Sequence, residues 1–207
     1  MTRDGAAPDE YEIVDKTVCH DGFFRVERHR LRFRRFDGDW SEVIEREVID
    51  RGHAAAVLLY DPDLDHVVLI EQFRAPAVDA PGGPWLIETV AGIIEAGETA
   101  ESVARREAIE ESGCTVGALV RIGEFLTSPG GTTERVTFFC GRVDAAAAGG
   151  IHGGAEENED IRVVTMSVDE ATAAVADGRI RVANAVIPLQ WLALNRERLR
   201  AAWRAPG

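Results

Sequence analysis

The sequence has few cysteines, and their spacing suggests no disulfide or metal-binding pair. Cys19, Cys114 and Cys140 lie far apart, are odd in number and form no CxxC motif. This pattern argues against a disulfide framework, gives no zinc signature and favours a reducing compartment. The opening stretch MTRDGAAPDE has no apolar signal-peptide core, and no apolar run approaches the roughly 18 residues of a membrane span. We therefore expect a cytoplasmic protein with no membrane partner.

Positive charge is also scarce. Asp and Glu number 36 against 23 Lys and Arg, which gives a formal net charge of −13. This balance argues against a general nucleic-acid or anionic-membrane binder, because phosphates are repelled overall. Six arginines between Arg25 and Arg35 could suggest a nucleic-acid patch, but a strand with one solvated or subunit-facing side is the simpler interpretation. An anionic substrate would need cations or local arginines to reverse the field.

The apolar pattern predicts an α/β protein. The 207 residues suffice for one sizeable domain, or for a domain with a smaller appendage. Helices are expected over 99–112, ending at Gly113, from the capping box at Ser167 to about Gly178, and over 182–203. The last has Ile187, Trp191 and Leu194 on one side, and 145–160 is expected to be a flexible acidic loop. Strands are expected within 11–48, with a turn at Asp37-Gly38, and over 53–61, 66–74, 85–94, 114–126, 134–144 and 161–166, which favours a mixed sheet packed against helices.

Two carboxylates occupy the apolar stripe of the helix expected over 99–112. Glu107 and Glu111 lie four positions apart, so they share one face, and they continue the line of Val103 and Ala104. Two charges about 6 Å apart at an effective dielectric near 20 repel by roughly 3 kcal/mol, and facing the core adds desolvation. A divalent cation between them would offset both effects, and ligation by oxygen favours Mg²⁺ or Mn²⁺.

The alternative is a solvated acidic face made of Glu107, Glu110 and Glu111. Arg106 is expected to point elsewhere on the helix, so it does not neutralise the pair. The helix alone leaves both interpretations open.

The surrounding stretch GIIEAGETAESVARREAIEESGC, which begins at Gly92, resembles the Nudix box of the Nudix hydrolases. The one mild departure from the pattern of the box is Cys114, which stands where the family usually has an aliphatic residue. TSPGGTTERV, GIHGGAEENEDIRV and ANAVIPLQWLAL, with Pro129 some fifteen residues past the box, resemble the bacterial ADP-ribose pyrophosphatase branch. The resemblance implies a Nudix-type α/β/α sandwich with a mixed sheet, an N-terminal antiparallel strand region, and cleavage of a nucleoside diphosphate linked to another moiety.

The resemblance also implies roles for individual residues. The glutamates Glu107 and Glu111, the backbone carbonyl of Ala91 and, when its loop closes, Glu159 are expected to bind metal. Glu157 is expected to be the catalytic base that activates water, although an acidic surface loop is the ordinary interpretation of its run. Whether Glu110 joins through water is left open. The structural part of the box comprises an ion pair of Glu98 with Arg106 and the turn glycines Gly92, Gly97 and Gly113.

Substrate contacts are expected from arginines and aromatics, since the guanidinium fork suits phosphate. In the resembled branch, Arg46, Arg51 and Arg74 meet the diphosphate and ribose, and Phe23 and Phe24 stack an adenine across a dimer. Structural arginines and a core aromatic pair are the alternatives. The remaining expected substrate-binding residues are Glu47, Ile93, Ser128, Pro129, Gly130 and Glu134.

The expected organisation is residues 1–50 as an N-terminal strand region for dimerisation and substrate clamping, and residues 51–207 as the Nudix hydrolase domain of a homodimer. The expected activity is Mg²⁺-dependent hydrolysis of ADP-ribose to AMP and ribose 5-phosphate. The nearest alternative is a pyrophosphatase for another nucleotide sugar, GDP-mannose or ADP-glucose. Two non-enzymatic hypotheses are a non-catalytic ADP-ribose-binding sensor and a plain scaffold.

Overall fold

The computed structural model describes residues 8–154 and 159–203, and the chain divides into two compact units. The first unit comprises the chain up to Gly52 together with Leu126–Glu134. The second comprises His53–Phe125 and the chain from Arg135 onward.

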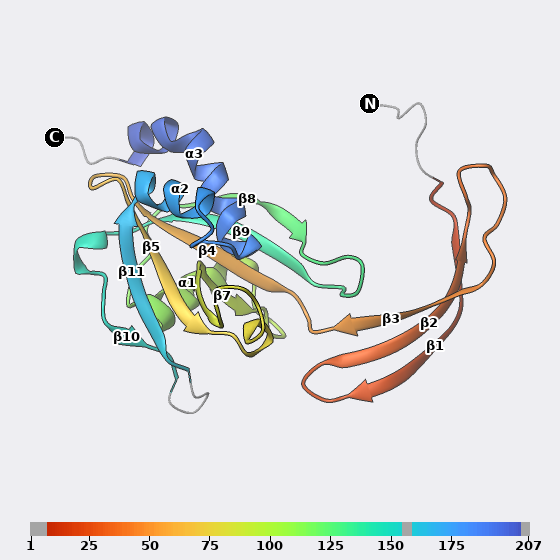
Figure 1. Ribbon diagram of the computed structural model, residues 1–207. Coiled ribbons are helices and arrows are strands. Elements are labelled where there is room, and N and C mark those ends of the chain that lie inside the picture. Colours follow the sequence, from red (N-terminus) through yellow and green to blue (C-terminus); the bar gives the residue numbers. More distant parts are fainter. Residues whose placement is uncertain (1–7, 155–158, 204–207) are drawn as a thin grey trace. The chain divides into compact units, whose positions relative to one another are not determined.

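The first unit contains a three-stranded antiparallel sheet in the order β1-β2-β3 (Figure 1). Its strands are β1 (Tyr11–Asp21), β2 (Arg25–Phe33) and β3 (Ile44–Asp50). Strand β1 is solvent-exposed at every residue. Five of the six clustered arginines pair with carboxylates, which fits a solvated strand face better than a basic patch: Arg25 with Glu27, Arg30 with Glu45, Arg32 with Glu12, Arg34 with Glu10 and Arg35 with Asp37.

The segment Leu126–Glu134 is hydrogen-bonded to the end of β3. The N–H of Ile49 donates to the carbonyl of Gly131 at 2.8 Å, and the N–H of Thr133 donates to the carbonyl of Ile49 at 3.0 Å. The hydroxyl of Thr133 also donates to Asp50 at 3.2 Å. These bonds hold the Pro129–Gly130 turn beside β3, although the two segments are far apart in sequence.

The second unit contains a mixed sheet in the order β10-β11-β5-β4-β9-β8, with β6 paired to β5 and β7 paired to β4. Strands β4 and β9 are parallel, whereas β5, β6, β7 and β11 form antiparallel pairs. The strands are β4 (Ala54–Asp61), β5 (His66–Phe73), β6 (Trp85–Glu88), β7 (Val90–Ile93), β8 (Leu119–Leu126), β9 (Arg135–Arg142), β10 (Ile151–His152) and β11 (Ile161–Ser167).

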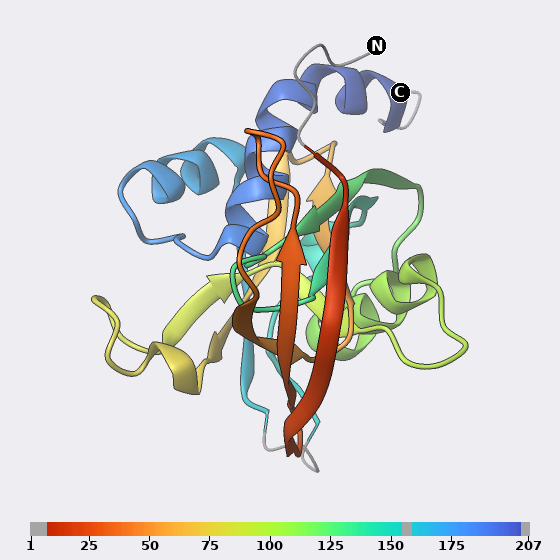
Figure 2. The same ribbon diagram turned by 90° about the vertical axis from the view of Figure 1, so that its right-hand side faces the viewer.

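Helices cover both faces of this sheet, as Figure 2 shows. Helix α1 (Ala100–Ser112) packs on one face, where Val103 and Ala104 join the buried side chains of β4 and β5. Helices α2 (Val168–Ala176) and α3 (Ala183–Trp203) pack on the other. Apolar burial on both faces stabilises the sheet. The predicted α/β/α sandwich with a mixed sheet is confirmed.

Local sequence signals place the ends of α1. The Thr99 hydroxyl accepts a hydrogen bond from the N–H of Ser102, whose hydroxyl accepts one from the N–H of Thr99. At the other end, Gly113 is left-handed, with φ of 69°, a conformation that glycine adopts without steric cost.

Three expectations for individual segments were wrong. Residues 85–94 form two strands, because β4 and β5 pair with each other only near their turn, and β6 and β7 then pair with one of them each. Leu194 is 88% exposed, because the inner face of α3 carries Leu189, Leu192 and Leu199 instead. The expected loop over 145–160 includes, in its described part, a short 3₁₀ turn (Ala145–Ala147) and strand β10, whereas residues 155–158 lie outside the described residues. Among the described residues, no helix is long and apolar enough to span a membrane.

Candidate active site

The two carboxylates of α1 face strand β7 at close range. Glu111 is only 6% exposed, and its Oε2 accepts a hydrogen bond from the N–H of Ala91 at 3.1 Å. Glu107 lies one turn earlier, and a Cβ built on Gly92 would come within 1.7 Å of its Oε1. Any side chain at position 92 would therefore displace the Glu107 carboxylate, which fills the space beside this glycine. The interpretation of this pair as a solvated acidic face is wrong.

Burial dominates the electrostatics of this pair. Burial raises the pKa of Glu111 to about 8; the hydrogen bond from Ala91 opposes the shift, and the charges of Glu107 and Glu159 add to it. Burial also raises the pKa of Glu107, although the charge of Arg106 and its hydrogen bond to Glu107 act to lower it. Because arginine charge only partly compensates this carboxylate pair, the site favours a bound proton or cation.

Arg106 links the loop before α1 to the helix. Its Nε lies 3.0 Å from Glu98 Oε1, and its Nη2 lies 3.3 Å from Glu98 Oε2. Its Nη1 contacts Glu107 Oε1 at 2.8 Å and Glu110 Oε2 at 2.9 Å. The expectation that Arg106 points elsewhere was wrong, because one guanidinium fork reaches all three carboxylates.

Arg74, which follows the end of β5, pairs with Glu88 and lies near enough to Glu111 and Glu159 to be affected by their charges. Burial alone lowers the pKa of Arg74, but the hydrogen bonds and charge of Glu88, followed by the charges of Glu111 and Glu159, raise it above its ordinary value. Glu159 therefore lies near enough to influence Arg74, Glu107 and Glu111. The predicted base, Glu157, lies outside the described residues.

The described residues include only part of the metal site and catalytic base predicted from sequence. Within 8–154 and 159–203, no group of three or more His, Cys, Asp or Glu could hold a metal ion. The described residues place the two α1 carboxylates beside the backbone of Ala91, and the exposed Glu159 near enough for its charge to act on both. Ile93, at the end of β7, is partly exposed.

Several of the predicted substrate residues meet in the first unit. A hollow of about 450 Å³ is lined by residues from β2, β3 and the 129–133 segment. It brings together Arg46, Glu47, Pro129 and Gly130, and it adds His29, which sequence reasoning missed. Spacing gave no signal for His29, because it reaches this hollow only through strand pairing with Arg46.

A second group in the first unit joins Arg51, Glu134 and the two phenylalanines. Arg51 Nε lies 3.3 Å from Glu134 Oε1, and the guanidinium lies over the Phe24 ring at 5.9 Å from its centroid. Phe23 is 82% exposed and meets Phe24 edge-on. The interpretation of these rings as a core pair is therefore wrong. Ser128 lies in the turn, where its carbonyl accepts from the N–H groups of Gly131 and Thr132.

Residues 50–186 match the sequence profile of the NUDIX domain. This chain belongs to the Nudix family. The chain is 49% identical over 194 residues to a protein of Escherichia coli (strain K12) named ADP-ribose pyrophosphatase, with 94% of this chain and 93% of that protein covered. It is 40% identical over 188 residues to a Cronobacter sakazakii protein named GDP-mannose pyrophosphatase, with 89% of this chain and 95% of that protein covered.

The fold of this Nudix protein is also found in a crystal structure described as an ADP compounds hydrolase. The TM-score is 0.70 at 19% sequence identity, covering 97% of this chain and 100% of the other. At this identity the likeness shows the fold alone.

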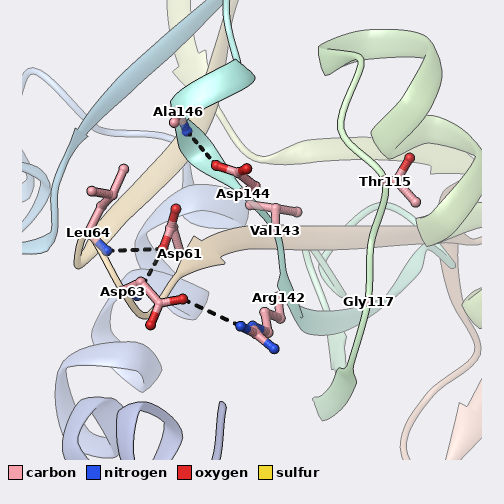
Figure 3. Close-up of a pocket in the computed structure, with 9 residues that line it drawn as sticks. All are labelled: Asp61, Asp63, Leu64, Thr115, Gly117, Arg142, Val143, Asp144 and Ala146. Atoms are coloured by element: carbon pink, nitrogen blue, oxygen red, sulfur yellow. Dashed lines mark hydrogen bonds and ion pairs between the residues drawn. The ribbon is translucent and has the colours of Figure 1, made fainter. Parts of the chain in front are cut away.

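Another hollow, of about 520 Å³, is lined by three aspartates and one arginine among other residues: Asp61, Asp63, Asp144 and Arg142 (Figure 3). Asp61 Oδ1 accepts from the N–H groups of Asp63 and Leu64 at 2.8 and 3.0 Å, and its Oδ2 accepts from the N–H of Ala145 at 2.9 Å. Asp144 caps the N–H of Ala146 at 3.0 Å. Because backbone amides engage Asp61 and Asp144, and Arg142 pairs with Asp63, we interpret this hollow as structural.

Proposed function

We propose that this Nudix protein hydrolyses the diphosphate bond of ADP-ribose with the help of Mg²⁺ or Mn²⁺. The observation that carries the proposal is the pair of the half-buried Glu107 and the buried Glu111, which faces β7 within a Nudix box that departs from the family pattern only at Cys114. The substrate follows from the relative named ADP-ribose pyrophosphatase, at 49% identity against 40% for the one named GDP-mannose pyrophosphatase.

The residues present suit a hard divalent cation, because their donors are all oxygen and the carboxylates lack full compensation. Glu107, Glu111, the carbonyl of Ala91 and Glu159 would hold it. When bound, the ion would neutralise charge on the diphosphate oxygens and make a coordinated water more acidic.

The protein's own groups then divide the remaining tasks. Glu157 takes a proton from the attacking water, whose oxygen bonds to one phosphorus as the bond from that phosphorus to the bridging oxygen breaks. The products are AMP and ribose 5-phosphate. Arg74 binds diphosphate oxygens, and the Glu98–Arg106 pair keeps the box loop fixed to α1.

The first unit supplies the other substrate contacts. Phe23 and Phe24 are exposed aromatic surfaces suited to stacking a base, and the hollow beside Arg46 and Glu47 suits ribose and phosphate groups. The fully exposed strand β1 supports assembly as a homodimer. We further propose a cytoplasmic location and a small-molecule substrate, with no nucleic-acid or membrane partner. Elution of the active protein as a monomer in gel filtration would contradict the dimer.

A substrate panel tests the activity. ADP-ribose, GDP-mannose and ADP-glucose would be compared with Mg²⁺ present, with products detected as phosphate after phosphatase treatment. We expect the highest kcat/KM for ADP-ribose. An equal or higher value for GDP-mannose would overturn the assignment, and binding of ADP-ribose without metal-dependent hydrolysis would instead support a sensor.

A further inference from the structure

Glu88 is a buried carboxylate outside the Nudix box. It ends strand β6, is 6% exposed and lies opposite Ile70 of β5. Burying a charged carboxylate is unfavourable unless hydrogen bonds and an opposite charge compensate it. Its partners therefore indicate why a carboxylate stands at this position.

The main partner of Glu88 is Arg74. Arg74 Nη2 donates to Glu88 Oε2 at 2.8 Å, and its Nε lies 3.2 and 3.3 Å from the two carboxylate oxygens. The buried amide of Gln72 approaches Glu88 Oε2 at 3.5 Å. A two-point contact of this kind fixes the plane of the guanidinium as well as its position.

The orientation leaves one edge of Arg74 available. Within the described part of the chain, Nη1 of Arg74 makes no hydrogen bond, and the side chain is 43% exposed. Arg74 also lies near enough to Glu111 and Glu159 to feel their charges. A guanidinium with one side fixed and the other open, near the carboxylates of Glu111 and Glu159, is suited to receive a phosphate oxygen.

We propose that Glu88 is a positioning residue that holds Arg74 through Nε and Nη2, so that Nη1 is directed to the diphosphate of the substrate. This inference rests on the proposed function. A plain structural ion pair would affect stability without a specific effect on substrate affinity.

The test measures KM, kcat and thermal unfolding for Glu88→Gln, Arg74→Ala and the double variant. Glu88→Gln keeps the volume but removes the charge, and we expect it to raise KM for ADP-ribose about tenfold while kcat changes less than about twofold, as for lost uniform binding. Arg74→Ala should raise KM at least as much. The double variant should match Arg74→Ala, because Glu88 acts only through Arg74.

Glu71→Gln is the matched control. Glu71 lies on β5, and its carboxylate pairs with Arg162, so the same chemical change removes an ion pair of the same sheet. We expect this variant to retain the wild-type KM. Glu88→Asp, which keeps the charge but shortens the reach, provides a second variant and should raise KM less than Glu88→Gln. The dissociation constant for ADP-ribose, measured by calorimetry in EDTA, should increase across these variants in the same order as KM.

The outcomes separate two failures. If the wild type hydrolyses ADP-ribose, two results would overturn the positioning role alone. The first is an increase in KM for the double variant that equals the product of the two single increases. The second is an unchanged KM in both Glu88 variants. No hydrolysis of ADP-ribose by the wild type would overturn the proposed function, and the positioning role with it.

Discussion

Gly92 and Glu107 share a space that admits only one side chain. A Cβ at position 92 would lie 1.7 Å from Glu107 Oε1 and 2.3 Å from its carboxyl carbon. The strand therefore contributes to the site by what it leaves out, since any larger residue would displace the carboxylate.

Gly92→Ala should remove activity while leaving the fold intact. The added methyl group displaces Glu107, and we expect kcat/KM to fall at least about a hundredfold, since small displacements of catalytic groups have large effects. Gly149→Ala is the matched control, because a Cβ there meets nothing within 4 Å. Steady-state kinetics and circular dichroism would check this. Full activity in Gly92→Ala would mean that Glu107 need not occupy this place.

Glu111→Gln should abolish metal-dependent turnover and yet stabilise the metal-free protein. Burial raises the pKa of Glu111 to about 8, so the folded state binds a proton that the unfolded state releases above its ordinary pKa. The wild type should therefore lose stability as pH rises from about 5 to about 8, by roughly 3 kcal/mol, and the variant should lose less.

Chemical denaturation in EDTA at several pH values measures this difference. The control is Glu101→Gln, an exposed glutamate of the same helix paired with Arg105. Parallel pH profiles for Glu111→Gln and the wild type would show that Glu111 carries no burial cost.

Asp65→Asn should destabilise the protein at neutral pH. Burial would raise the pKa of Asp65, but hydrogen bonds from Arg196 and Tyr60 and the charge of Arg200 outweigh it and lower the pKa. The stabilisation is therefore present above the ordinary Asp pKa and is lost as pH falls through the lowered value. Asn suits the left-handed backbone here, with φ of 60°, so the variant isolates the charge.

Urea unfolding at pH 7 and at pH 3 would check the Asp65 prediction. We expect the free energy of unfolding of Asp65→Asn to be about 2 kcal/mol below that of the wild type at pH 7, and this difference to be smaller at pH 3. Asp63→Asn, an exposed aspartate of the same turn paired with Arg142, should change stability by less than about 0.5 kcal/mol. Equal effects of the two variants at pH 7 would contradict the role of the Asp65 network.

Glu157→Gln should reduce kcat at least about a hundredfold and leave ADP-ribose binding nearly unchanged, because a general base acts in the chemical step. Its neighbour Glu156→Gln provides the control and should remain active. Single-turnover kinetics with calorimetric binding would separate the two effects. Wild-type turnover in Glu157→Gln would remove this residue from the mechanism.

Much of the fold follows from local patterns in the sequence. The capping residues Thr99 and Ser167 and the left-handed Gly113 act within a few residues, so helix ends could be predicted. The division of residues 85–94 into two strands could not, because it depends on where β4 and β5 separate. The inner face of α3 was misassigned because its apolar residues lie on more than one side.

The candidate site shows the same division between local and distant signals. Helical spacing places Glu107 and Glu111 on one face, and the resemblance of the surrounding residues to the Nudix box gave that face its predicted metal-binding role. Glu88 was missed, because its significance depends on a contact with Arg74 across two paired strands. The reach of Arg106 was also missed, since the side-chain conformation of a long arginine is set by surrounding carboxylates rather than by its helical position.

The most direct test is a crystal structure with Mg²⁺ and a non-hydrolysable ADP-ribose analogue. Our account predicts one or more metal ions bound by Glu107 and Glu111, in contact with the diphosphate oxygens. A complex in which the analogue occupies its site while both carboxylates remain free of metal would contradict it.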